Sequence, residues 1–129
     1  MVFQLGRSKS KKNQLSVILE SEVIESSSGS CTEVLVVRVV NEGNSDVVLV
    51  RVGIMLEDGR KFFFPSEQVS KNLPMVLEPG ALGLFAQEVD QCFHLLKWEG
   101  YVGAVEFSAL VVDEFLTAYC GEIVSFEIN

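Results

Sequence analysis

The chain has 129 residues, of which 48% are hydrophobic and nine are phenylalanine, and it carries a net charge of −8. This apolar content excludes a disordered chain, and no apolar run approaches the roughly 18 residues of a membrane-spanning helix. The first twelve residues contain four basic side chains and no acidic one, so the remainder carries six basic and 18 acidic side chains, a net of −12. A body this negative repels phosphate, and we expect no binding of nucleic acid by it.

The basic residues of the first twelve positions, Arg7, Lys9, Lys11 and Lys12, are expected to lie in a flexible tail. Residues 13–129 then form a single domain, which is long enough to bury a core without metal or disulfides. The start of the chain does not fit a secretory signal, because its basic residues follow the short apolar piece instead of preceding it. We therefore expect a cytoplasmic protein.

Three strands are predicted before residue 58. Residues 14–24 alternate between apolar and polar, with Leu15, Val17, Leu19 and Val23 on one side, which is typical of a half-exposed strand. Residues 33–41 are mostly Val and Leu and favour a buried strand. A polar loop over 41–46 leads to a third strand over 47–57, whose even-numbered residues make the better core face: Val48, Val50, Val52, Ile54 and Leu56.

The pair Asp58-Gly59 lies between two apolar runs and predicts a β-hairpin. A two-residue loop would place Phe62 beside Met55. A three-residue loop over 57–59, with Gly59 at positive φ in a bulge, instead places Phe62 beside Ile54 and Phe64 beside Val52. Only this second register keeps the even-numbered core face intact, so we predict it.

The middle of the chain predicts a turn and one helix. After a polar connector over 66–72, Pro79 and Gly80 fit the central positions of a type II turn. A strand over 81–87 follows, with Leu82, Leu84 and Ala86 of one parity. A short helix is expected over about 89–98, where Asp90 can cap the amino end, Gly100 ends the helix and Trp98 seals it against the sheets.

Two further strands are expected at the C-terminal end. Residues 101–113 form a long strand in which Val105, Phe107, Ala109 and Val111 oppose polar residues. Residues 115–129 form the last strand, interrupted at Cys120-Gly121, because glycine within a strand pattern commonly marks a bulge.

About seven strands with regular turn signals, and no alternation of strands with helices, indicate an all-β, antiparallel two-sheet sandwich. The runs VNEGNSDVVLVRVGIMLEDGR and LPMVLEPG resemble the small immunoglobulin-like or fibronectin type III-like domains of many uncharacterised bacterial proteins. The resemblance covers about Val34 to Val112 and implies an immunoglobulin-like sandwich with one short helix. It implies no function, since that group has none in common. The chain departs from antibody-type domains in lacking a Trp on the second central strand.

The three cysteines, Cys31, Cys92 and Cys120, are an odd and widely spaced set, which favours free thiols. A bridge between Cys31 and Cys120 is the alternative. Cys92 and His94 are the nearest thiol and imidazole, but residues two apart on a helix point in different directions and cannot share a metal ion. We expect no metal and no cofactor.

No carboxylate pair, serine elbow or phosphate-binding loop predicts catalysis, so we do not expect an enzyme. The leading hypothesis is a non-catalytic module that binds a protein partner or assembles with itself. The alternative is a hydrolase or metal-dependent enzyme with a loop-built site near His94. If the even positions of the third strand face the core, an apolar surface for a homodimer is left on the opposite face: Leu49, Met55, Phe63, Val102, Leu110 and Val112.

Overall fold

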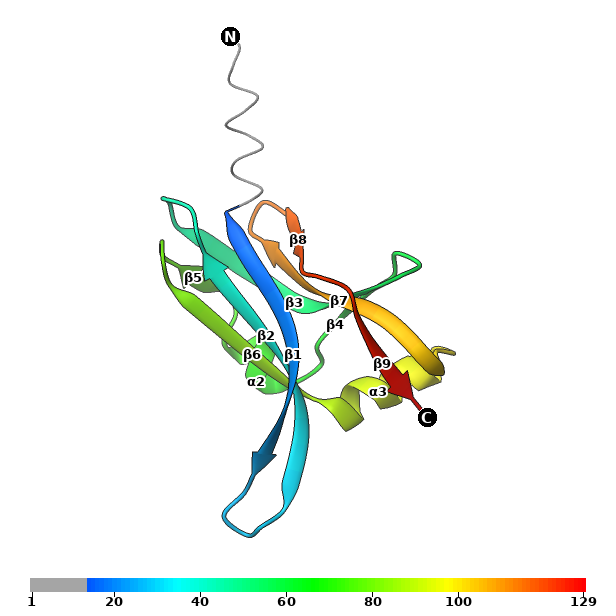
Figure 1. Ribbon diagram of the computed structural model, residues 1–129. Helices are drawn as coiled ribbons and strands as arrows, with labels where there is room; N and C mark the ends of the chain where they lie inside the picture. The colour runs from blue at the N-terminus through cyan, green and yellow to red at the C-terminus, as the bar shows by residue number, and fades with distance from the viewer. Residues whose placement is uncertain (1–13) are drawn as a thin grey trace.

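Two antiparallel β-sheets account for most of the computed structural model, which describes residues 14–129, the side chain of Gln68 excepted. The expected basic tail over residues 1–12 lies outside the described residues. The smaller sheet has three strands in the order β1-β2-β6, with β1 at Leu15–Glu25, β2 at Cys31–Asn41 and β6 at Leu82–Glu88. Figure 1 shows β2 between its two neighbours.

The larger sheet has six strands built around β3 (Val47–Leu56) and β7 (Gly103–Asp113), which pair with each other. Two short strands, β4 (Lys61–Phe63) and β5 (Met75–Leu77), pair with the other edge of β3. The last two, β8 (Ala118–Cys120) and β9 (Val124–Ile128), pair with β7. The expected single interrupted strand over 115–129 is therefore two strands, separated where the backbone at Gly121 passes β1: a Cβ on Gly121 would lie 2.4 Å from the Val17 carbonyl oxygen.

The core lies between the two sheets and follows the alternation of the strands. The smaller sheet contributes Leu15, Val17, Leu19, Leu35, Val37 and Val39, and the larger one Val52, Ile54, Val105, Phe107, Ala109 and Val111. Phe107 stacks on Phe126, with ring centroids 4.9 Å apart. Burying apolar side chains of this size stabilises the fold by about 1.5–3 kcal/mol each before entropy costs. The prediction of an all-β protein with two sheets is confirmed.

The hairpin between β3 and β4 has the predicted register. Phe62 pairs with Ile54, the Phe64 amide donates to the Val52 carbonyl over 3.0 Å, and Phe64 is buried. Gly59 has φ of +90°, and the Leu56 amide donates to the Arg60 carbonyl, which leaves a three-residue loop. The turn at residues 78–81 also agrees, with Gly80 at φ +81° and the Ala81 amide bonded to the Glu78 carbonyl.

The face assignment of β3 was wrong at its start. Its ladder with β7 is irregular between Leu49 and Arg51, and Leu49 is fully buried while Val48 and Val50 are half-buried. An extra residue in a strand reverses the faces on one side of the irregularity. The even-numbered core face therefore holds only from Val52 onward.

Two helices are present among the described residues, where one was expected. The polar connector contains α2 (Glu67–Lys71), which is fastened to β6 through a hydrogen bond from the Ser66 amide to the Gln87 side chain (3.1 Å). The second helix, α3 (Val89–Trp98), buries Val89, Cys92 and Leu96. No side chain caps its amino end, so the role expected of Asp90 was wrong. Trp98 is 81% exposed and does not seal the helix.

The hairpin of β1 and β2 extends beyond the body as an arm (Figure 1). β6 pairs with β2 only from Val34 to Val40, so the tip of the hairpin has no third strand. Val23, which was expected on the buried side of β1, is therefore 67% exposed. The alternation of β1 continues past the end of the layer that would bury it.

Buried polar side chains support the loops of the fold. Asn41 is fully buried, donates to the carbonyls of Ser45 and Leu77 over 2.8 Å each, and accepts from the Gly43 amide over 3.0 Å. It thereby joins the end of β2 to the loop before β3 and to β5. Asp113 accepts hydrogen bonds from the Thr117 amide and the Tyr119 hydroxyl between β7 and β8. Both residues have the partners that burial demands of polar groups, and they are structural.

Candidate functional site

The surface expected to carry a homodimer is largely buried within the chain. Leu49 and Leu110 have no exposed area, Val112 is buried, and Met55 and Phe63 are half-buried. Val102 is 62% exposed, but it lies before β7 on the connection from α3. The structure does not bring the six residues together as one exposed apolar surface, so this part of the prediction was wrong.

The reason lies at Gly53, in the cross-strand row Phe63–Gly53–Leu110–Cys120. Strand β4 passes so close that a Cβ on Gly53 would lie 2.1 Å from the Phe62 carbonyl oxygen and 2.6 Å from the Phe63 Cα. Because Gly53 contributes no side chain, the backbone of β4 lies close against this position, beside Leu110 in the same row. The Arg51 guanidinium lies over the Phe63 ring, 5.0 Å from its centroid, and shields this face further.

The outer face of the smaller sheet is more open. Its rows run Ser16–Val40–Leu82 and Ile18–Arg38–Leu84, followed by Glu20–Val36–Ala86. Three large apolar side chains on it are half exposed: Ile18 at 49%, and Leu82 and Leu84 at 51% each. Together with the half-buried Val40 they form what we name the outer apolar patch (Ile18, Val40, Leu82 and Leu84).

Arg38 lies within this patch, between Ile18 and Leu84, and its side chain reaches toward an acidic region. Its guanidinium is paired with Glu20 and donates to Glu22 over 3.1 Å, so the side chain reaches across the row of Val36, which is buried. The hydrogen bond to Glu20, followed by the charge of Glu20, raises the pKa of Arg38 above its ordinary value. Arg38 therefore remains charged and covers the sheet on one side of the outer apolar patch only.

The two edges of the smaller sheet differ in their protection. Strand β1 carries Glu20, Glu22 and Glu25 and is approached at Val17 by the backbone of Gly121. Strand β6 ends the sheet on the other side, and its run Leu82–Gln87 contains no charge and no proline. Charges, prolines, bulges and covering segments are the usual means by which an edge strand avoids pairing with another chain. Between Leu82 and Ala86 the β6 edge carries neither a charge nor a proline.

The backbone of β6 offers hydrogen bonds on this edge. The Asn41 amide donates to the Ala81 carbonyl, so the antiparallel ladder with β2 continues through Gly83, Phe85 and Gln87. The amides and carbonyls of the alternate residues, Leu82, Leu84 and Ala86, then point away from β2. All three residues are exposed. Within residues 14–129, no other strand pairs with them.

A second concave region lies where the β3–β4 hairpin meets the segment before β7. The cleft has a volume of about 360 Å³, and Asp58, Tyr101 and Glu106 are among the residues that line it. The Tyr101 hydroxyl donates to Asp58 over 2.6 Å, which lowers the pKa of Asp58 and raises that of Tyr101. Arg60 binds Glu99 over 2.6 Å and lies over the Phe62 ring. These bonds fasten the hairpin to the α3–β7 connection.

One carboxylate pair borders the same cleft. A hydrogen bond with Glu106, followed by the negative charge of Glu106, raises the pKa of Glu57 above its ordinary value. Both side chains are exposed to solvent. General acid–base catalysis needs a carboxyl group held in a cleft with a partner for the substrate, and here water surrounds the pair.

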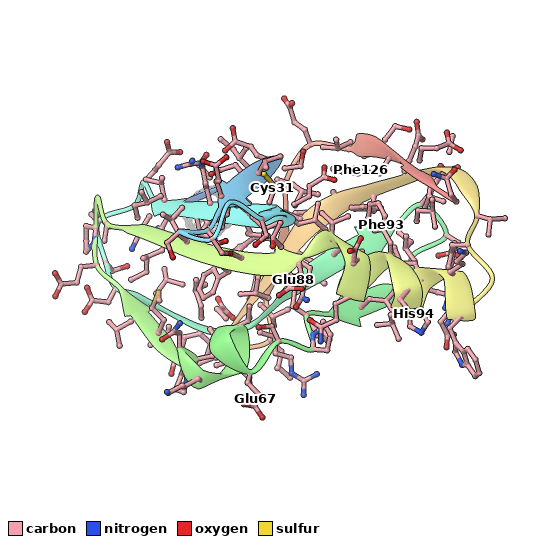
Figure 2. The ribbon with its side chains drawn as sticks, turned by 90° about the horizontal axis from the view of Figure 1, so that it is seen from below. Cys31, Glu67, Glu88, Phe93, His94 and Phe126 are labelled. Atoms are coloured by element: carbon pink, nitrogen blue, oxygen red, sulfur yellow. The ribbon has the colours of Figure 1, made fainter. Side chains whose placement is uncertain are left out.

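Helix α3 separates the thiol and the imidazole that the sequence places two residues apart. Cys92 faces the core, where burial raises the pKa of its thiol to about 12, so it is not a nucleophile at neutral pH. His94 is exposed, and in the described part of the chain it forms no hydrogen bond or ion pair. Figure 2 shows Phe93 turned toward Phe126, with ring centroids 5.9 Å apart, and His94 on the other side of the helix.

All three cysteines are free, as predicted, with Cys31 and Cys120 exposed and Cys92 buried. Among residues 14–129, no three His, Cys, Asp or Glu side chains are grouped so that they could hold a metal ion. In that part of the chain, no helix has both the length and the apolar character needed to cross a membrane.

The sequence indicated a strand at residues 81–87 but not that it would end a sheet. The alternation expected there is present, with Leu82, Leu84 and Ala86 on the exposed side and Gly83, Phe85 and Gln87 buried. The absence of charge in this stretch was a signal that sequence reasoning missed. An uncharged strand is ordinary at the centre of a sheet and unusual at an edge.

Comparison with known proteins leaves the function open. No protein-family model matches the chain, and no curated protein matches it. One similar solved structure is described as the X-ray structure of Northeast Structural Genomics Consortium target SoR45. It is 14% identical, with a TM-score of 0.46, and the match covers 91% of this chain and 87% of that one.

Proposed function

We propose that the protein is a non-catalytic module that binds an extended segment of a protein at the open edge and outer face of its smaller sheet. The observation that carries the proposal is the uncharged β6 edge, where Leu82 and Leu84 are each 51% exposed and their outward backbone groups pair with no other strand among residues 14–129. An added strand would gain main-chain hydrogen bonds from the edge and apolar contacts from the outer apolar patch.

The immunoglobulin-like or fibronectin type III-like form of the sandwich belongs to this proposal. Its support is the two antiparallel sheets with one shared core and the hairpin and turn that the resemblance singled out. An intracellular location is also part of it, supported by three unpaired thiols. The alternative of an enzyme near His94 has no specific observation in its favour, because Cys92 and His94 lie on different sides of α3.

Affinity capture from cells that express the protein tests the proposal. Wild type is compared with the double variant Leu82→Lys/Leu84→Lys and with Val76→Lys, a matched change at a residue on β5 that is 58% exposed. We expect a protein retained by wild type and by Val76→Lys and lost with the double variant, because lysine places charge on the edge. Circular dichroism checks that both variants keep the β-structure of wild type.

Two results would contradict the proposal. One is a retained protein that binds the double variant as well as wild type. The other is a chain that captures no protein and does not associate with itself at any concentration.

A further inference from the structure

We infer that the partner strand at the β6 edge is β6 of a second copy, so that two smaller sheets join into one continuous six-stranded sheet across a two-fold axis at Leu84. This inference rests on the proposed function and names its partner. Two features occur together at Leu82, Leu84 and Ala86 and carry the inference. The side chains of these residues are exposed, and their backbone amides and carbonyls point outward from the sheet.

Charge permits a second copy at this place. The chain outside its first twelve residues has a net charge of −12, so two copies repel each other over most of their surface. The other edge of the sheet is acidic through Glu20, Glu22 and Glu25. The run Leu82–Gln87 contains no charge, and an interface between identical copies requires a patch that does not repel itself.

The sequence of the edge is complementary to itself in one register. Antiparallel pairing about Leu84 places Leu84 opposite the partner's Leu84 and Leu82 opposite the partner's Ala86, so a large residue meets a small one. On the inner face the same register sets Gly83 opposite the partner's Phe85. Hydrogen-bonded pairs then fall on Leu82, Leu84 and Ala86, whose backbone groups are the ones that point outward.

The two neighbouring registers are poorer. Pairing about Phe85 sets Leu82 opposite the partner's Glu88 and places a carboxylate on an apolar side chain. Pairing about Gly83 sets two glycines opposite each other and leaves a gap on the inner face.

Joining the edges also extends the outer apolar patch. In the pairing about Leu84, Leu82 and Leu84 of both copies lie on one face of the six-stranded sheet. Ile18 lies in the same row as Leu84 but two strands away from it, roughly 10 Å at the usual strand spacing. Ile18 therefore belongs to the same face but not to the β6 edge, which makes it the control for edge pairing.

Amide hydrogen exchange, measured residue by residue over a range of protein concentrations, tests the inference. We expect exchange at Leu84 to slow by roughly tenfold or more as concentration rises, and exchange at Leu82 and Ala86 to slow with it. Gly83 and Phe85 are internal controls because their amides bond β2 in either state. Light scattering should give a mass approaching twice 14.3 kDa as the Leu84 amide becomes protected.

Two matched substitutions separate the edge from the face. Ile18 and Leu84 lie in one row and are 49% and 51% exposed, so Ile18→Lys and Leu84→Lys add the same charge at equal exposure. We expect Leu84→Lys to abolish the concentration dependence and Ile18→Lys to preserve it. Equal loss in both variants would mean association through the face and would overturn edge pairing.

Disulfide trapping fixes the register. With Cys31 and Cys120 changed to serine, Leu84→Cys should form a covalent dimer on oxidation, because residues paired at the axis have Cα atoms about 5.5 Å apart. Leu82→Cys should not, since its copy lies four residues along the ladder, roughly 14 Å away. A covalent dimer from Leu82→Cys alone would overturn the register.

A chain that stays monomeric at high concentration, with Leu84 exchange unchanged, overturns the inference. The proposed function survives that result if the capture experiment still retains a protein that Leu82→Lys/Leu84→Lys loses. The inference of a second copy and the proposed function can therefore fail separately.

Discussion

The outer faces of the two sheets both carry large apolar residues, but they expose these residues to different extents. On the larger sheet, Leu110 is fully buried beside Gly53, and Arg51 lies over Phe63. On the smaller sheet, Leu82 and Leu84 are half exposed at the end of the sheet. An apolar side chain on a sheet face is thus available to a partner only where the chain does not cover it with its own neighbours.

The position of each strand contributes to the difference, in addition to the close approach that Gly53 permits. β3 and β7 are central, so residues on their outer face have neighbours on both sides. β6 has a neighbour on one side only, and that neighbour presents Arg38, whose side chain turns toward Glu20 and away from the leucines. Three comparisons between substitutions, taken from the largest expected effect to the smallest, sharpen this contrast.

Gly53→Ala should have the largest effect. A methyl group at this position would overlap the backbone of β4, at 2.1 Å from the Phe62 carbonyl oxygen, and backbone cannot move aside as a flexible side chain can. We expect a loss of about 2–4 kcal/mol in the free energy of unfolding, measured with urea.

Gly83→Ala is the matched control on the smaller sheet. A Cβ there would lie 3.3 Å from the Met75 sulfur, which belongs to a flexible side chain. We expect a change within about 1 kcal/mol. If both glycines tolerated alanine equally, the close approach of β4 would not be what protects the larger sheet.

The second comparison removes one large side chain from each outer face. Phe63→Ala should destabilise the chain by about 1–2 kcal/mol, because Phe63 is half-buried and packs under Arg51. Leu84→Ala should cost less than about 0.5 kcal/mol in dilute solution, since half of its surface already meets water. Chemical denaturation of both variants at low concentration gives the result, and a greater loss for Leu84→Ala would reverse the contrast.

Local turn chemistry was readable from the sequence, and burial at the ends of strands was not. Asp58-Gly59 and Pro79-Gly80 predicted the conformation of their turns because few residues tolerate positive φ. The predicted core face of β3 was wrong at Leu49, because an irregularity in the ladder does not show in the alternation of residue types. The predicted burial of Val23 was wrong, because the alternation of apolar and polar residues does not indicate where the opposite layer ends.

The residues of the candidate site could not be predicted from the sequence, for a related reason. Phe63, Leu110 and Val112 looked available because their strands alternate, but their exposure depends on which strands lie beside them. Strand order is set by contacts between segments far apart in the chain. The uncharged run at Leu82–Gln87 gained its meaning only once β6 was found at an edge.

The third comparison is made at Gly59, which belongs to the hairpin that holds Phe63 beside Gly53. No atom lies within 4 Å of a Cβ built on Gly59, so the cost of a side chain there is the backbone conformation alone, at φ +90°. Gly59→Ala should therefore lower the free energy of unfolding by about 1 kcal/mol. Gly59→Asn should cost less, because asparagine tolerates positive φ better than alanine does. The free energies of unfolding are compared through the urea midpoints of Gly59→Ala and Gly59→Asn at an unchanged slope. Equal losses for the two variants would mean that steric crowding, and not the positive φ, limits the choice of residue in this turn. The two glycines of one hairpin would then be constrained alike, whereas the structure assigns a steric reason to Gly53 and a conformational one to Gly59.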